Sequence, residues 1–254
     1  MPDVELLKAA LVKAGEVAMR HFGNSLEQWN KPDGSLLTAA DLAVNETLHA
    51  MLTSARPDDG WLSEEGPTDK TRTQKSQCWI LDPIDGTRSF AAARHEWCIG
   101  LCLAQNGRPV ISGVLHPSTH KLFLAERGKG TTLNGAPLRV KDGAGLQGAT
   151  LAARSAARKR VEGAGFHALD VIHTPQIARL AMLAAGEVDA VLSFGWKHDW
   201  DLAPGALLVT EAGGIVSDER GHEMIFNGPK AEQFGLVAAG PQRHAAVMNF
   251  MEKA

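Results

Sequence analysis

The sequence has little of what zinc-binding, disulfide-stabilised or nucleic-acid-binding proteins need. Its 254 residues include three cysteines, Cys78, Cys98 and Cys102, which form no zinc-type pair spacing and cannot all pair with one another. Cys98 and Cys102 lie in an apolar run typical of a strand, so we expect buried free thiols there. The 26 Lys and Arg against 29 Asp and Glu give a net charge of −3 without any basic block, which argues against a nucleic-acid polymer as an obligate partner.

Long hydrophobic runs are also missing. No apolar run approaches the length that spans a bilayer. Residues 1–22 mix acidic and basic side chains in an amphipathic pattern, unlike a signal peptide. With 44% hydrophobic residues the chain can bury a large core, as one large domain or two smaller ones. We therefore expect a soluble cytoplasmic protein without a membrane partner.

Helices and short strands are predicted in the first part of the chain. Apolar residues at helical spacing predict a helix over 3–22, ending near Gly23. Thr38 is predicted to cap a second helix, in which Asp41 is the third residue. A short strand at 60–63 runs into Glu64 and Glu65. The polar segment 67–77 is predicted to be a mobile loop.

The pattern then changes twice. Alternating runs separated by turn residues predict an antiparallel meander of strands at 97–105, 109–115 and 121–126. After about residue 145 strands and helices alternate. The predicted elements are strands at 149–153, 168–171, 188–192 and around 235–239, and helices at 155–164, 175–186, 202–212 and from 241. We therefore predict an N-terminal α+β region (1–145) and a C-terminal α/β region (146–254) within one compact unit of layered sheets and helices.

The segment 79–87, Trp-Ile-Leu-Asp-Pro-Ile-Asp-Gly-Thr, carries the clearest chemistry. A short apolar strand ends in Asp82, Pro83 fixes the backbone, and Asp85 and Gly86 follow before a predicted helix start. Two carboxylates on a rigid turn bind hard divalent cations such as Mg²⁺. Backbone N–H groups at a helix start can hold phosphate. Together these features indicate metal-assisted phosphoryl hydrolysis.

Acidic residues in other segments could contribute to the same site as this turn. Glu64 and Glu65 end a strand upstream, and Asp201 follows Trp200 at a predicted helix start that closes on Glu211-Ala-Gly-Gly. With Lys31 and the Thr-Ala-Ala-Asp run at 38–41, these motifs occur in the order and at the separations of one known family. Over nearly its whole length, the chain resembles the inositol monophosphatase superfamily of Mg²⁺-dependent, lithium-sensitive phosphatases.

The resemblance implies a fold and a set of residue roles. The fold is a layered αβαβα sandwich like those of inositol monophosphatase and fructose-1,6-bisphosphatase, and the cofactor is two or three Mg²⁺ ions. Asp82 is expected to bridge two ions, with Glu64 and the Ile84 carbonyl completing one site and Asp85 and Asp201 the other, while Glu65 could help a third. Asp41 and Thr87 are expected to activate the attacking water as base and relay. The Gly86 and Thr87 N–H groups are expected to hold the phosphate.

The substrate, a small phosphorylated metabolite, is less defined. Inositol-specific members usually carry an acidic residue where this chain has Phe194. Arg88 replaces a threonine of those members and could meet a second phosphate or face solvent. We favour a 3'(2'),5'-bisphosphate nucleotidase-like activity, with inositol-1-monophosphatase, then histidinol-phosphatase, and lastly a non-catalytic regulatory protein as alternatives. Because relatives are often dimers, this chain could also form a homodimer.

Further predictions concern residues near the expected site and on the surface. Lys197 is expected on the substrate rim, and Asp199 is expected to cap the helix that follows. Residues 94–96 are expected to be ordinary surface rather than to approach the leaving group. The basic residues Arg154, Arg158, Lys159 and Arg160 are expected to form a solvated helix face.

Overall fold

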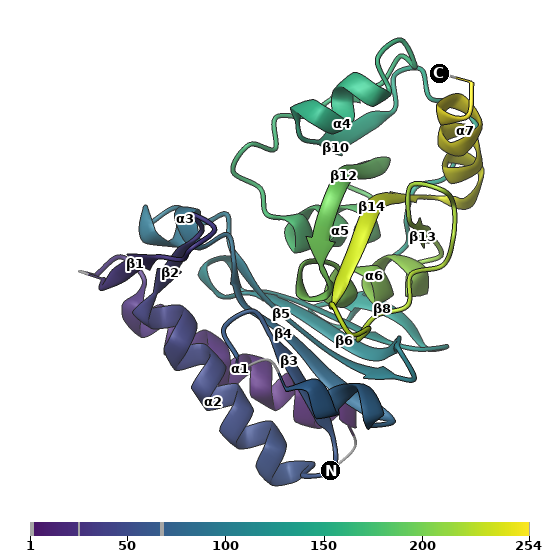
Figure 1. The fold of residues 1–254 in the computed structure, drawn as a ribbon. Coiled ribbons are helices and arrows are strands. Elements are labelled where there is room, and N and C mark those ends of the chain that lie inside the picture. The colour runs from purple at the N-terminus through teal and green to yellow at the C-terminus, as the bar shows by residue number, and fades with distance from the viewer. Residues whose placement is uncertain (1–2, 25, 67–68, 254) are drawn as a thin grey trace.

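The computed structural model describes residues 3–24, 26–66 and 69–253. Within them, a seven-stranded and a five-stranded sheet stack with helices between and outside them (Figure 1). The outer layer on the first sheet is α1 with α2, the middle layer is α5 with α6, and the outer layer on the second sheet is α4 with α7. Their bounds are α1 Asp3–His21, α2 Ala39–Ala55, α4 Ser155–Arg160, α5 Gln176–Ala184, α6 Asp199–Glu211 and α7 Pro241–Met251. The predicted αβαβα layering is confirmed.

Three hydrophobic clusters fill the spaces between these layers. One joins α1 and α2 to the first sheet through side chains such as Leu11 and Leu48. The largest lies between the two sheets around α5 and α6, with Leu180 and Leu208 fully buried. A third lies between the second sheet and its outer helices. Helices pack on both large sheets through these three clusters, so side chains at the strand ends are left to form the site.

The seven-stranded sheet has the order β3-β4-β5-β6-β7-β8-β9. β3 pairs with β4 in parallel, and every other neighbouring pair is antiparallel. The predicted meander is thus present. The bounds are β3 Gly60–Ser63, β4 Gln77–Asp85, β5 Cys98–Gln105, β6 Arg108–His116, β7 Lys121–Glu126, β8 Gly130–Leu133 and β9 Ala136–Pro137.

The five-stranded sheet has the order β11-β10-β12-β14-β13. β10 is parallel to β11 and β12, whereas β14 is antiparallel to β12 and β13. The bounds are β10 Thr150–Ala153, β11 His167–Ala168, β12 Ala190–His198, β13 Ile215–Ser217 and β14 Glu232–Ala239. The boundary that we predict between regions 1–145 and 146–254 falls between the two sheets' strands and stays a prediction.

Several predicted bounds are wrong. Residues 70–74 of the expected mobile loop form a 3-10 helix, η1 Lys70–Gln74, held by the buried Arg72, which donates to the Gly228 carbonyl. Residues 67 and 68 lie outside the described residues. The helix expected over 155–164 ends at Arg160, because the chain turns through Gly163 with a φ of +85°. β12 extends past residue 192 because it pairs with β14 beyond a bulge at 193–196.

The sequence prediction missed a hairpin and several short elements. β1 Gln28–Asn30 and β2 Leu36–Thr38 pair antiparallel and lead directly into α2. The others are the strands β8, β9 and β13, the 3-10 helix η2 Pro117–Thr119, and α3 Thr87–Ala91, of which only the start is predicted. No helix within the described residues is both long and apolar enough to cross a membrane.

Candidate active site

β4 delivers two carboxylates to the same place. In a regular strand, side chains three residues apart point to opposite faces. The pairing of β4 with β5 shifts register between Asp82, opposite Gly100, and Asp85, opposite Cys98. Pro83 lies within this irregularity and has no N–H to offer a neighbouring strand. The bulge therefore allows Asp82 and Asp85 to converge.

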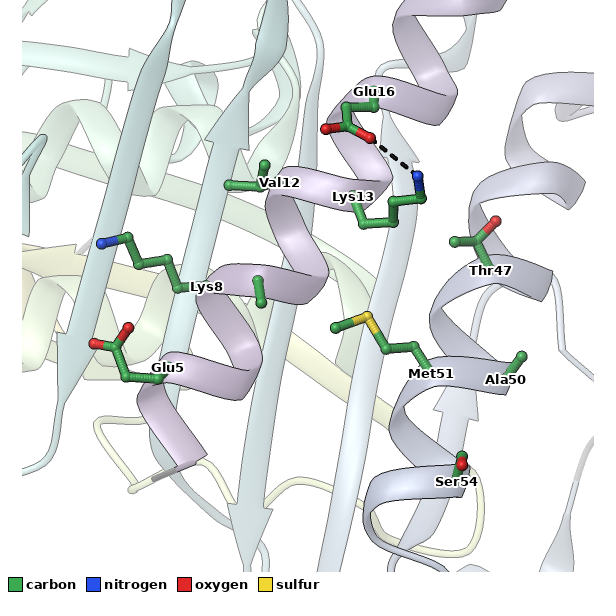
Figure 2. Close-up of a pocket in the computed structure, with 10 residues that line it drawn as sticks. Glu5, Lys8, Val12, Lys13, Glu16, Thr47, Ala50, Met51 and Ser54 are labelled. Carbon is green, nitrogen blue, oxygen red and sulfur yellow. Dashed lines mark hydrogen bonds and ion pairs between the residues drawn. The ribbon is translucent and has the colours of Figure 1, made fainter. Parts of the chain in front are cut away.

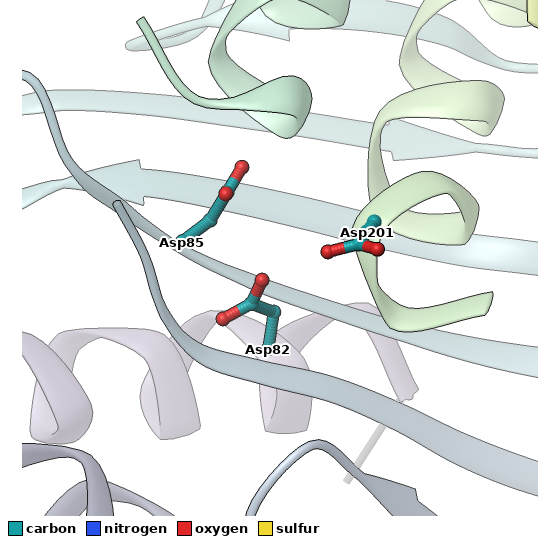
Figure 3. A group of neighbouring side chains, drawn as sticks. All are labelled: Asp82, Asp85 and Asp201. Carbon is teal, nitrogen blue, oxygen red and sulfur yellow. The ribbon is translucent and has the colours of Figure 1, made fainter. Parts of the chain in front are cut away.

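The third carboxylate comes from α6. Asp201 is the third residue of this helix, and its Oδ2 accepts a hydrogen bond from the His198 N–H at 3.0 Å. One carboxylate oxygen from each of Asp82, Asp85 and Asp201 lies within 4.8 Å of the other two. Figure 3 shows the three side chains pointing toward one another from β4 and α6. The fold thus brings together three predicted metal ligands from two motifs, one in each half of the chain.

The electrostatics of this cluster favour a bound cation. Burial, followed by the charge of Glu64, raises the pKa of Asp82 well above its ordinary range. Burial and then Asp201 raise the pKa of Asp85 to about 7, and burial and then Glu64 raise that of Asp201 to about 6. Oδ1 of Asp82 is buried without a hydrogen-bond partner among the described residues. A buried, unpartnered carboxylate oxygen among like charges is costly, and a divalent cation removes that cost. The residues therefore fit a hard cation such as Mg²⁺.

Asp41 and Thr87 lie together beside this cluster. Thr87 Oγ1 is 3.4 Å from Asp41 Oδ1 and 3.1 Å from the carbonyl oxygen of Ile84. The other oxygen of Asp41 accepts hydrogen bonds from the Thr38 hydroxyl at 2.5 Å and the Thr38 N–H at 2.9 Å. Burial raises the pKa of Asp41 to about 7 despite these bonds. Asp41 can thus accept a proton near neutral pH, and α2 holds it rigidly.

A glycine makes the turn between β4 and α3. Gly86 has a φ of +101°, a conformation that side chains disfavour. A Cβ placed there would lie 2.8 Å from the carbonyl oxygen of Glu96. Asp85 is fixed from the other side, because its Oδ2 accepts a hydrogen bond from the Ile177 N–H at 2.7 Å. The turn that we predict to bind phosphate is thus tightly constrained.

Glu64 and Glu65 are occupied by a lysine that the sequence prediction links to the site only by resemblance. Lys31 Nζ donates to Glu64 Oε1 at 2.8 Å and to Glu65 Oε1 at 2.5 Å. Although burial opposes it, the hydrogen bond to Glu64 is the first of several effects that raise the pKa of Lys31 above its ordinary value. The charge of Glu64 also helps to raise the pKa values of the three clustered aspartates, so Glu64 lies near them. Its carboxylate, however, is hydrogen-bonded to Lys31.

A cavity of about 390 Å³ opens beside these groups. Its lining includes Glu64 and Asp85, the turn from Gly86 to Ser89, and two arginines, Arg94 and Arg154. One expectation is therefore wrong, because Arg94 is half-buried and lines the cavity rather than lying on ordinary surface. Arg154 is exposed, as expected, and also lines the cavity. Arg88 also lines the cavity while donating to the Gly34 carbonyl at 2.9 Å.

A larger cavity of about 1060 Å³ lies elsewhere, in the groove between α1 and α2 (Figure 2). Its lining includes Val12 and Met51, and the exposed ion pair of Lys13 with Glu16 at 3.1 Å. Neither a carboxylate cluster nor a nucleophile–base pair appears among these lining residues. The smaller cavity is therefore the candidate active site.

Three residues near α6 have other surroundings. Asp199 does not cap the helix, contrary to the prediction, because it is buried and accepts hydrogen bonds from Asn227 and Gln233. Lys197 is half-buried beside Asp201, and its Nζ donates to the Trp196 carbonyl at 3.1 Å. Phe194 lies under the guanidinium of Arg160, 4.5 Å from the ring centre. The role of Lys197 on the substrate rim stays a prediction.

Comparison with known proteins agrees with this geometry. Residues 3–251 match the model of the Inositol monophosphatase family. The chain belongs to this family. Members of the family are metal-dependent phosphatases that act on small phosphorylated substrates. The site described above lies within the matched residues.

Individual relatives cover most of the chain. It is 32% identical over 248 residues to a protein named Nus factor SuhB from Xylella fastidiosa, covering 91% of this chain and 88% of that protein. It is also 32% identical over 248 residues to inositol-1-monophosphatase from Mesorhizobium japonicum, covering 89% of each. The solved structure of an IMPase from Thermotoga maritima superposes with a TM-score of 0.85 over 100% of this chain and 98% of that one. Its 24% identity shows the fold alone.

Proposed function

We propose that this protein is a Mg²⁺-dependent phosphatase that hydrolyses a small-molecule phosphomonoester with water as the nucleophile. The observation that carries the proposal is the convergence of Asp82, Asp85 and Asp201, with an unpartnered Asp82 oxygen, next to the Thr87–Asp41 pair. Family membership supports the same reaction class.

The roles of the residues follow from their positions. Asp82, Asp85 and Asp201 would hold the metal, with Glu64 and the Ile84 carbonyl as further ligands. Mg²⁺ held there would lower the pKa of a bound water and stabilise the negative charge on the leaving oxygen. As the oxygen of the attacking water bonds to phosphorus and the ester P–O bond breaks, Asp41 accepts the water's proton through Thr87 Oγ1. The leaving alkoxide takes a proton from solvent and departs as the alcohol. The N–H groups of Gly86 and Thr87 hold the phosphate oxygens.

The identity of the substrate is a finer proposal. A 3'(2'),5'-bisphosphate nucleotidase-like activity remains our first choice, because Arg88 faces the cavity and Phe194 replaces the acidic residue typical of inositol-specific members. Inositol 1-phosphate is the second choice, supported by the relative from Mesorhizobium japonicum that carries this activity in its name. Histidinol phosphate is the third.

A regulatory binding protein is the second candidate function. It is favoured by one observation, the name Nus factor carried by the relative from Xylella fastidiosa. A chain that had kept the fold for binding alone should have lost metal ligands first. Asp41, Thr87 and the three aspartates of the cluster are all present and adjacent here. We therefore rank catalysis first.

Phosphate release tests the proposal. The purified protein is incubated with inositol 1-phosphate, adenosine 3',5'-bisphosphate, fructose 1,6-bisphosphate and histidinol phosphate, with Mg²⁺ or with a chelator. We expect Mg²⁺-dependent release from at least one substrate. The Asp82→Asn variant serves as the matched control for a contaminating phosphatase and should lose the activity. If no phosphate is released from any of them in the presence of Mg²⁺, the enzyme proposal fails.

A further inference from the structure

One side of the active-site cavity is cationic. Arg88, Arg94 and Arg154 line the same cavity as Glu64 and Asp85. Arg88 belongs to α3 and Arg94 to the loop that follows it, whereas Arg154 is the N-cap residue of α4, in the other half of the chain. Segments far apart in the sequence therefore place three guanidinium groups around one cavity.

These three guanidinium groups have no carboxylate partner among the described residues. Arg88 donates only to a backbone carbonyl, that of Gly34, at 2.9 Å. Nε of Arg94 is buried and has no hydrogen-bond partner in the part of the chain that the structure describes. Some arginines outside the cavity do have carboxylate partners: Arg108 pairs with Glu223 at 2.7 Å, and Arg160 with Glu219 at 3.1 Å. Unpaired guanidinium groups that share a cavity are available to an anion from outside the chain.

Arg154 lies close enough to influence Arg179 and Lys197, two cationic side chains beside the aspartate cluster. Burial lowers the pKa of Arg179 to about 10, and the positive charge of Arg154 is the next cause. The same charge contributes to the lowered pKa of Lys197, after burial and Arg179. Asp85 and Asp201 act on Arg179 in the opposite direction. The cationic side and the carboxylate cluster are therefore neighbours within a single site.

We propose that the substrate carries a second phosphate, which Arg88, Arg94 and Arg154 bind while the scissile phosphate lies at the carboxylate cluster. This inference rests on the proposed function and narrows its substrate class. A guanidinium offers a planar pair of donors that matches a phosphate bidentately. A substrate with a neutral leaving group would displace water from these guanidinium groups without offering them an anion, which is unfavourable. A second phosphate would accept hydrogen bonds from the three arginines and neutralise part of their positive charge.

Matched substrate pairs test the proposal. Specificity constants, kcat/KM, are measured with saturating Mg²⁺ for adenosine 3',5'-bisphosphate against adenosine 3'-phosphate, and for inositol 1,4-bisphosphate against inositol 1-phosphate. The members of each pair differ by one phosphate. We expect the bisphosphate to be preferred by about 10-fold or more in at least one pair, as for charge-assisted hydrogen bonds. A substrate with a carboxylate in place of the second phosphate, phosphoglycolate, shows whether any anion suffices; turnover equal to that of the bisphosphates would overturn the assignment to phosphate.

Variants of the arginines test which side chains cause the preference for the bisphosphate. Arg154→Gln and Arg94→Gln are each expected to lower the ratio of the two specificity constants by about 10-fold, and Arg154→Lys should restore part of it. Lys159→Gln removes the same charge from an exposed position on α4 and should leave the ratio unchanged. Thermal unfolding shows whether each variant is folded. Equal specificity constants within both pairs, or a ratio that Arg154→Gln does not change, would overturn the second-phosphate proposal while leaving the phosphatase intact. If none of the substrates is hydrolysed, it is the proposed function that fails.

Discussion

Replacing Asp85 by Asn should separate the catalytic role of this carboxylate from its role in the fold. The carboxylate accepts a hydrogen bond from the Ile177 N–H at 2.7 Å, and the amide oxygen of Asn can accept the same bond. The substitution thus keeps the size of the side chain and its link to α5. It removes one of the three charges of the aspartate cluster.

The size of the effect on stability follows from the pKa of Asp85. Burial and the neighbouring Asp201 raise it from 3.8 to about 7. At about 1.4 kcal/mol for each pKa unit, keeping Asp85 ionised costs the metal-free fold at most about 4 kcal/mol. The folded protein binds this proton more tightly than the unfolded chain, so this cost grows as pH rises from about 4 to about 7 and is then constant. At pH 8 and without metal, the Asp85→Asn variant should therefore melt above the wild type, by about 3 °C or more.

Mg²⁺ should shift the difference between the two melting temperatures toward the wild type. A cation that binds only the folded state raises its stability, and the wild type has the more complete ligand set. We therefore expect Mg²⁺ to raise the melting temperature of the wild type more than that of Asp85→Asn. Catalytic turnover in the variant should fall at least about 100-fold, since changing groups that merely support metal ligands already costs 10–100-fold.

Differential scanning calorimetry with and without Mg²⁺ and a phosphate-release assay measure both effects. Asp69→Asn is the matched control, because Asp69 also accepts a hydrogen bond from a backbone N–H, that of Thr71 at 2.8 Å, outside the cluster. It should change neither turnover nor the response to Mg²⁺. Near-normal turnover in Asp85→Asn, or a metal-free variant that melts well below the wild type, would refute the reasoning.

Three further predictions use the same site. Burial raises the pKa of Asp41 to about 7 in the metal-free protein, and the positive charge of bound Mg²⁺ lowers it, so kcat/KM should reach its plateau at or below about pH 7; a kcat/KM that falls as pH rises from 5.5 to 7 would exclude Asp41 as the base. Lithium at millimolar concentrations should inhibit phosphate release by displacing the weakly held second ion, as the family resemblance implies, and undiminished rates would contradict this. Gly86→Ala should destabilise the protein by about 1–3 kcal/mol in chemical denaturation, since its φ is +101° and the new Cβ would meet the Glu96 carbonyl; unchanged stability would show that the turn relaxes freely.

The sequence alone predicts the elements that depend on local patterns. α1 and α2 are found because their apolar residues recur at helical spacing and Thr38 caps α2 with Asp41 in a reciprocal pair of hydrogen bonds. The hairpin of β1 and β2 is missed because its strands have three residues each and β1 is wholly exposed, so no alternation of apolar and polar residues marks it.

Contacts between distant segments were not predictable from such patterns. The motifs identify Asp82, Asp85 and Asp201 as ligands, but only the fold shows that a bulge in β4 aligns the first two and that α6 brings the third within 4.8 Å. The bond from the Ile177 N–H to Asp85 and the place of Arg154 in the cavity had no sequence signal. Both depend on how the second sheet and its helices pack against the first.

The central claim is that the buried aspartates of β4 and α6 form the metal centre of a phosphatase. Anomalous X-ray scattering from crystals of this protein grown with Mn²⁺, a cation with the oxygen preference of Mg²⁺, tests it most directly. The account predicts a manganese peak within coordination distance of Asp82, Asp85 and Asp201, which the Asp82→Asn variant weakens or lacks. Ordered, well-resolved aspartates with no peak between them, or a peak only at another place in the molecule, would contradict it.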